Sequence, residues 1–94
     1  MITHIVMWKF KEGTRKQAKE FLDGLQALDG VIPQIRSVET RLSCNPANTF
    51  DALLIVKFDS MEDLQAYQQD PRHLAAGAPH KELRENRAAM DYES

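Results

Sequence analysis

The sequence predicts one α+β domain over residues 1–94, with the element order β-α-β-β-α-β. Three observations lead to this prediction. First, four short stretches are rich in β-branched and other apolar residues, which is typical of strands. Secondly, two longer stretches repeat their apolar residues at helical spacing. Thirdly, Gly, Pro, Asn and Asp fall where one pattern changes into the next. This order is the split βαβ arrangement of ferredoxin-like folds, which predicts a four-stranded antiparallel sheet with its helices on one face.

The composition is that of a globular domain, with 43% hydrophobic and 28% charged residues. The net charge of −2 is spread along the chain, so we expect no nucleic-acid partner, because such binders usually carry a basic surface. The sequence has no signal-peptide pattern and no long apolar run, so we expect no membrane partner and a cytoplasmic location. Cys44 is the single cysteine and forms no internal disulfide, which fits a reducing compartment.

The first strand is predicted over Ile2–Phe10, and a helix with Thr14 as its N-cap follows over Arg15–Leu28. Gly30 is the expected stop of this helix. Alternation along the strand places every second residue on one face. That face consists of Ile2, His4, Val6, Trp8 and Phe10.

The second predicted strand, Arg36–Cys44, has one polar face, which places it at an edge of the sheet. A loop rich in Asn and Pro follows at residues 45–49. Asp51–Phe58 is the most continuous apolar run in the chain. We therefore expect a central strand there, covered on both of its faces.

The second predicted helix begins after Ser60, its N-cap, and carries Met61, Leu64 and Tyr67 on one side. The residue before a proline is disfavoured in the α conformation, so this helix should end near Asp70. Tyr67 should then point under the helix toward the sheet.

The rest of the chain is predicted as one helical turn at residues 74–77, a helix from Pro79 to about Asn86, and a last strand at residues 87–92. The basic residues along this helix and just after it are Lys81, Arg84 and Arg87. We expect them on a solvated surface rather than at an anion site.

Two helices cover only one face of a four-stranded sheet, yet both faces of the predicted central strands are apolar. Ile5, Met7, Leu53 and Ile55 would lie on the uncovered face. Monomers rarely expose an apolar patch of this kind. We therefore expect a homodimer in which two sheets pack face to face and form an α/β barrel.

Tyr67 and His73 are the residues best suited to catalysis. A neutral imidazole can take a proton from the carbon next to a carbonyl, and a phenol can donate a hydrogen bond to the resulting enolate. No cofactor is expected, because the three histidines lack metal-ligand spacing and the glycines form no phosphate-binding loop. The residues expected to bind the substrate are His4, Val6, Trp8, Leu64 and Leu74.

Each of the polar candidates also has a purely structural interpretation. His73 would cap the carbonyls at a helix end, where the helix dipole favours its charged form. Tyr67 would pack in the core with its hydroxyl hydrogen-bonded. His4, on an apolar strand face, would be a buried histidine with satisfied hydrogen bonds.

Several motifs occur in a fixed order along nearly the whole chain: His4–Phe10, Ile32–Pro33, Phe58–Leu64, Tyr67, Pro71-x-His73 and Asp91–Glu93. Together they resemble the stress-responsive dimeric α/β-barrel domain family, often called Dabb. The resemblance implies one domain over residues 1–94, a ferredoxin-like protomer, and a homodimer with a shared barrel.

The resemblance also implies a type of chemistry. A plant polyketide cyclase of this family uses a histidine base and a tyrosine, and Tyr67 and His73 stand at the matching motif positions. His4 matches a further pocket histidine of that enzyme, whereas Ala52 replaces a second one. Some plant relatives hold a magnesium ion on backbone carbonyls. The matching positions here are Asp29, Ile32 and Ile35.

Three functions stay open at this stage. The first is a cofactor-free enzyme, of cyclase or lyase type, that moves protons on a keto or polyketide-like metabolite. The second is a non-catalytic stress-response or ligand-binding dimer, whose pocket takes a small apolar, phenolic or keto molecule. The third, by analogy of fold, is a cofactor-free monooxygenase. An open cleft on which His73 and Tyr67 converge would favour the first.

Overall fold

The computed structural model describes all residues, 1–94. Its elements are, in chain order, β1 (Ile2–Phe10), α1 (Arg15–Gln26), β2 (Ser37–Leu42), β3 (Ala52–Phe58), α2 (Met61–Gln69), α3 (Pro71–Gly77), the 3₁₀ turn η1 (Lys81–Leu83) and β4 (Arg84–Glu93). The longest helix, α1, has only 12 residues, and no helix has the length and apolar character that would let it cross a membrane.

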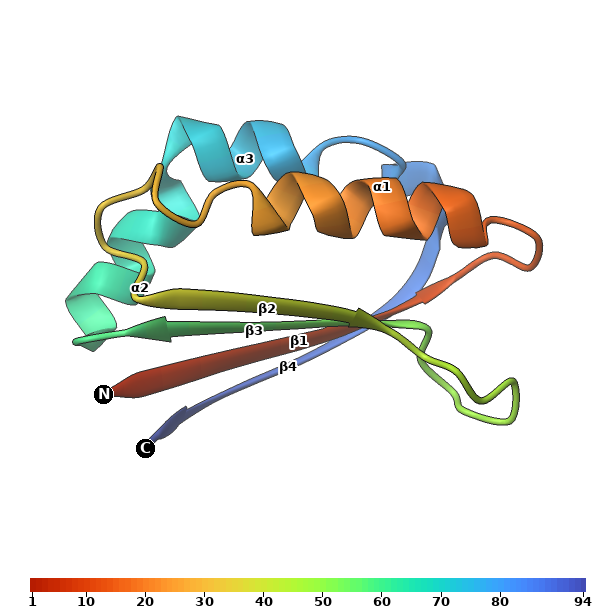
Figure 1. Cartoon of the computed structure of the whole chain (residues 1–94), viewed down its shortest axis with the longest axis horizontal. Helices are drawn as coiled ribbons and strands as arrows, with labels where there is room; N and C mark the ends of the chain where they lie inside the picture. Colours follow the sequence, from red (N-terminus) through yellow and green to blue (C-terminus); the bar gives the residue numbers. More distant parts are fainter.

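The four strands form one antiparallel sheet in the order β2-β3-β1-β4. All three α-helices lie on the same face of this sheet, and the opposite face is bare (Figure 1). In the centre, β1 pairs with β3 on one side and with β4 on the other, so that His4 lies between Val56 and Asp91. The predicted ferredoxin-like fold is thus confirmed.

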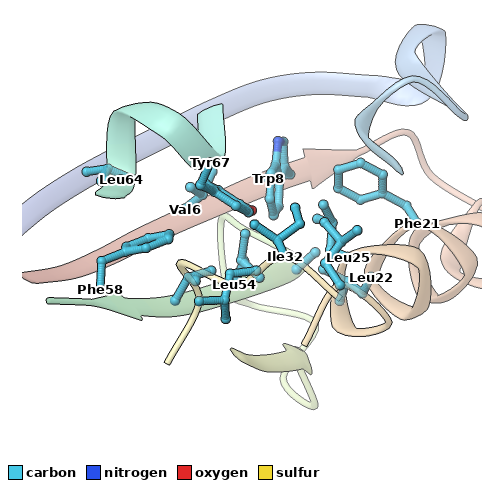
Figure 2. Packing of buried hydrophobic residues seen from close by; sticks show 14 of the residues in the cluster. Val6, Trp8, Phe21, Leu22, Leu25, Ile32, Leu54, Phe58, Leu64 and Tyr67 are labelled. Atoms are coloured by element: carbon cyan, nitrogen blue, oxygen red, sulfur yellow. The ribbon is translucent and has the colours of Figure 1, made fainter. Parts of the chain in front are cut away.

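The hydrophobic core fills the space between the helices and the sheet. Alternate residues of β1 and β3 point into it, and Val6, Val56 and Phe58 are almost completely enclosed. Phe21 of α1 and Tyr67 of α2 also belong to this core (Figure 2). Tyr67 is only 1% exposed, which confirms its predicted position under the helix.

One Asp-Pro pair both ends α2 and begins α3. Asp70 is the C-cap of α2 in an extended conformation, as the proline after it requires. The same side chain accepts a hydrogen bond from the backbone N–H of Arg72, at 2.8 Å, and so serves as the N-cap of α3. Pro71 occupies the first turn, where its missing N–H costs nothing. Where one turn at residues 74–77 was predicted, the helix therefore starts three residues earlier.

The predicted helix from Pro79 to Asn86 is wrong. Only the three residues of η1 are helical, and β4 already begins at Arg84. Arg84 pairs with Phe10, and the N–H of Lys11 donates to the carbonyl of Leu83 at 2.8 Å. Pairing with β1 thus outweighs the local helix preference of this segment. The first helix also ends at Gln26, earlier than predicted.

The bare face of the sheet is largely apolar. Ile5 and Met7 of β1 are half-buried there, as is Ile55 of β3, whereas Met90 of β4 is 62% exposed. A patch of this kind is a typical protein interface. We call it the open face and define it by Ile5, Met7, Leu53, Ile55, Ala88, Met90 and Tyr92.

Candidate functional site

A cavity of about 350 Å³ lies on the helix side of the sheet, between α1, α3 and the strands β1 and β4. Its volume lies within the range of small-molecule sites. The larger apolar lining residues are Val6, Trp8, Phe21, Leu25, Leu54 and Leu74. The polar ones are His4, Gln68, His73, Lys81, Arg84 and Arg87.

His73 lies in the first turn of α3 and forms part of the cavity wall. Burial of the ring lowers its pKa below the usual 6.5, because the charged form loses its hydration. The nearby Gln68 carbonyl and Asp70 act in the opposite direction, whereas His4 and Arg87 lower the pKa further. The imidazole is therefore neutral at pH 7 and able to accept a proton.

The two ring nitrogens of His73 have different surroundings. Nδ1 is enclosed and has no hydrogen-bond partner, although the Gln68 carbonyl lies near the ring. Nε2 makes no hydrogen bond to the protein and is not enclosed, so it is the nitrogen that a ligand can reach. Gln68 lies in the last turn of α2, so its carbonyl beside the His73 ring is the contact that the structural alternative, in which His73 caps a helix end, would use.

Tyr67 contacts His73 but does not line the cavity. The two ring centroids are 4.2 Å apart, and the phenol also packs against Phe58 at 5.1 Å. Its hydroxyl makes no hydrogen bond within the protein, and burial raises the pKa of the phenol well above 10. The phenol is thus protonated at every physiological pH, and its clearest contact is with the His73 ring.

His4 is a second imidazole in the cavity wall, 4% exposed, and it is held by a carboxylate. Its Nδ1 lies 2.5 Å from Oδ1 of Asp91, the residue directly opposite on β4. A ring that donates Nδ1–H to a carboxylate presents Nε2 as a hydrogen-bond acceptor. Asp91 was missed in the sequence because it lies 87 residues from His4 and only the strand register joins them.

Of the basic residues expected on a solvated helix surface, Lys81 and Arg87 are exposed, and Arg84 is partly buried. Only the 3₁₀ turn η1 is helical here, and Lys81, Arg84 and Arg87 all line the cavity. Arg84 is partly buried with its guanidinium 4.4 Å from the centre of the Phe21 ring. This side of the cavity is therefore cationic, whereas the floor formed by Val6 and Leu54 is apolar.

The other expected site residues divide into two groups. Val6, Trp8 and Leu74 lie in the cavity wall together with His4 and His73. Leu64 does not, because it points from α2 into the core and is only 1% exposed. The helical spacing of Leu64 indicated a buried face but could not distinguish packed core from cavity wall.

The backbone positions matched to a magnesium site follow α1 in the chain, and that site stays a prediction. The carbonyl of Ile32 accepts a hydrogen bond from the N–H of Ile35 at 3.1 Å, which leaves its second lone pair free. The chain also holds no cluster of three or more His, Cys, Asp and Glu side chains, whereas a protein magnesium site usually includes carboxylate. We assign no step to a metal at Asp29, Ile32 and Ile35.

Comparison with known proteins agrees with this architecture. The family model of the stress responsive A/B barrel domain matches residues 2–94 of the chain. A dimeric protein of ferredoxin-like fold from Bacteroides fragilis, of unknown function, is 34% identical, and the match covers 99% of this chain and 95% of that one with a TM-score of 0.91. No curated protein matches.

Two solved structures of lower identity share the fold. A hydroxynitrile lyase from Passiflora edulis is 18% identical, with a TM-score of 0.81 over 97% of this chain and 90% of that one. A candidate antibiotic biosynthesis monooxygenase from Nitrosomonas europaea is 16% identical, with a TM-score of 0.84 over 100% of this chain and 98% of that one. The fold and the family match together define a ferredoxin-like α+β protein. The chain belongs to the stress responsive A/B barrel domain family, Dabb.

Proposed function

We propose that this protein is a cofactor-free enzyme that removes a proton next to a carbonyl group of a small molecule, with His73 as the base. The observation that supports this most is a neutral imidazole in the wall of a preformed cavity, with Nε2 open and Nδ1 enclosed. General base catalysis by such a group contributes about 10²–10⁴-fold. The proton passes from the carbon to Nε2, and an enolate forms.

The remaining polar groups of the wall suit the carbonyl and the enolate. The indole N–H of Trp8 makes no hydrogen bond within the protein, and Trp8 lines the cavity, so it is free to donate to the developing oxyanion. His4, oriented by Asp91, accepts a hydrogen bond from a substrate hydroxyl through Nε2. We assign Tyr67 to holding the His73 ring, since it packs against that ring and lies outside the cavity wall.

The protein acts as a homodimer in this proposal, with two open faces packed together as a barrel. The open face is apolar and uncovered in the protomer, and the Bacteroides protein of 34% identity is dimeric. The cavity lies on the helix side of the sheet, so each protomer keeps its own complete site.

Exchange of carbon-bound hydrogen for deuterium tests the chemistry without knowledge of the full reaction. We would incubate the protein in D₂O with β-ketoacyl thioesters, simple ketones and keto acids, and follow the signal of the hydrogen next to the carbonyl by NMR. Wild type should accelerate exchange for at least one class, and His73→Gln should abolish it. His80→Asn is the matched control, because His80 lies outside the cavity wall in a left-handed conformation that Asn tolerates.

Two outcomes would contradict this proposal and support a different function. Ligand binding without exchange in any class would support a non-catalytic binding dimer. Oxygen consumption with phenolic substrates would instead support a monooxygenase, the activity named for the Nitrosomonas protein. Exchange that survives in His73→Gln would show that the base is another residue, and His4→Gln would then be tested.

A further inference from the structure

The charge of the cavity differs from that of the whole chain. The chain carries a net charge of −2, with 14 acidic residues. The cavity wall includes Lys81, Arg84 and Arg87 but no aspartate or glutamate. None of these three cations forms an ion pair: all six ion pairs of the protein involve other residues. Three positive charges without an ion-pair partner thus lie around one hollow in an acidic protein.

Arg84 is held in place for binding rather than free in solvent. Its guanidinium stacks on Phe21 at 4.4 Å, and Nη2 donates to the carbonyl of Gly77 at 2.6 Å. Nε is enclosed and has no partner, and Nη1 makes no hydrogen bond within the protein. Burial lowers the pKa of Arg84, and although nearby Glu82 raises it, the two form no ion pair. The site therefore carries a partly desolvated charge with unused donors.

Unsatisfied buried polar atoms are rare in native proteins, and each one calls for an explanation. Only two enclosed side-chain nitrogen or oxygen atoms lack a partner in this protein, Nδ1 of His73 and Nε of Arg84. Both residues line the same cavity. Elsewhere the chain satisfies its enclosed side-chain polar atoms, so both unsatisfied atoms belong to residues around this one hollow.

We propose that the cavity recognises a small molecule bearing a carboxylate, which Arg84 binds while Lys81 and Arg87 contribute positive charge at its rim. A planar guanidinium matches a carboxylate in shape, and its Phe21 stacking fixes the orientation of that plane. The apolar floor of Val6 and Leu54 takes the carbon skeleton of the ligand. Combined with the proposed function, on which this last step rests, the substrate class is a keto carboxylate whose carbonyl lies toward His73.

Binding of a matched pair of ligands tests the charge requirement. Phenylacetate and phenylacetamide have nearly the same shape, and they differ in one negative charge. We expect wild type to bind phenylacetate about tenfold more tightly or better, as is typical for hydrogen bonds to a charged partner. Arg84→Gln should remove this preference, and Lys81→Gln and Arg87→Gln should reduce it about two- to threefold each. Calorimetry on the intact dimer measures all of these.

The controls separate binding from folding and from catalysis. Arg15→Gln removes an exposed arginine outside the cavity and should leave the preference intact. Arg84→Lys keeps the charge without the planar fork, so it tests the site even if Arg84→Gln fails to fold. Equal binding of acid and amide by wild type, or full preference in Arg84→Gln, would overturn the proposal, as would tighter binding of inorganic phosphate than of phenylacetate.

The assembly supplies one more test. A dimer that dissociates in Arg84→Gln would show that the cations meet acids of a second copy, and this also would overturn the proposal. Hydrogen exchange is measured independently of binding. Carboxylate preference without exchange would therefore contradict only the proposed function, and exchange of neutral ketones without carboxylate preference would contradict only the inference drawn here.

Discussion

The two faces of the sheet are both apolar, but they meet different surroundings. On the helix side, Val6, Leu54 and Val56 are almost completely buried. On the open face, their neighbours Ile5 and Ile55 are half-buried and no element of the chain covers them. Alternation along a strand therefore reports which residues share a face, but not what lies against that face.

The helix side is itself divided into a packed part and a hollow part. Phe58, Leu64 and Tyr67 fill the space under α2 (Figure 2). The helix α3 carries no fully buried residue, and the cavity occupies the space between α3 and the sheet. The sheet thus borders three different regions: the packed core, the cavity and the open face.

Aspartate substitutions at two adjacent residues of β3 should show the largest difference between the two faces of the sheet. Val56→Asp places an unpaired carboxylate in the core, at a cost of several kcal/mol against a total stability of about 5–15 kcal/mol. We expect loss of the folded state by circular dichroism. Ile55→Asp places the charge on the open face, and should leave the folded spectrum but reduce the mass in light scattering from twice 10.7 kDa to 10.7 kDa.

The open face is not the interface if Ile55→Asp remains dimeric, or if wild type at micromolar concentration is already a 10.7 kDa monomer. Glu39→Gln is the matched control, because Glu39 lies beside Ile55 in the register of β2 and β3 but is already polar and exposed. The mass of the Glu39→Gln variant in light scattering should equal that of wild type.

Two leucines, both expected in the pocket, should distinguish packed core from cavity wall. Leu64→Ala removes an enclosed side chain and should cost about 2–5 kcal/mol of unfolding free energy. Leu74 is 59% exposed at the cavity, so Leu74→Ala should change stability by no more than about 0.5 kcal/mol. Urea unfolding measures both. Equal costs would mean that α3 packs as tightly as α2.

The smallest expected effect is the pH dependence contributed by His73. Its pKa in the folded state lies below the value of about 6.5 in the unfolded chain, so the unfolded state binds more protons between these two values. Stability should therefore fall as pH decreases through this window, and level off below the folded pKa. The neighbouring charged groups that act on the ring are His4, Asp70 and Arg87.

Unfolding free energies measured from pH 8 to pH 5 check this expectation. His73→Gln should lose part of the slope, and His80→Asn should retain it. A wild-type slope of the opposite sign would mean that His73 is more easily protonated in the folded protein, which would also weaken its role as a base.

Much of the fold followed from the sequence because its signals are local. Alternation in β1, the Ser60 cap of α2 and the stop at Asp70 each involve only a few neighbouring residues. The predicted helix after Pro79 failed because its residues favour a helix locally, whereas pairing with β1 decides the outcome. The start of α3 was missed because Asp-Pro was interpreted only as a stop, although Asp is also a good N-cap and Pro a good first residue.

The site was less predictable because it is assembled from distant segments. His73 and Tyr67 are close in the chain, and their proximity could be expected. Asp91 meets His4 only through the register of β1 and β4, and Arg84 meets Phe21 only because β4 begins there. A sequence pattern gives the face of each residue, whereas the position of a cavity depends on how helices of unequal length cover the sheet.

The central position of β1 has a consequence for how the protein acquires its structure. This strand is made first, yet its two partners, β3 and β4, follow about half a chain and nearly a whole chain later. Pairings between such distant segments are entropically costly to close and slow the search for the native state. The pairing of β4 with β1 also brings Arg84 to the cavity and Asp91 to His4. A newly made chain therefore completes its binding site only when its final strand has joined the sheet.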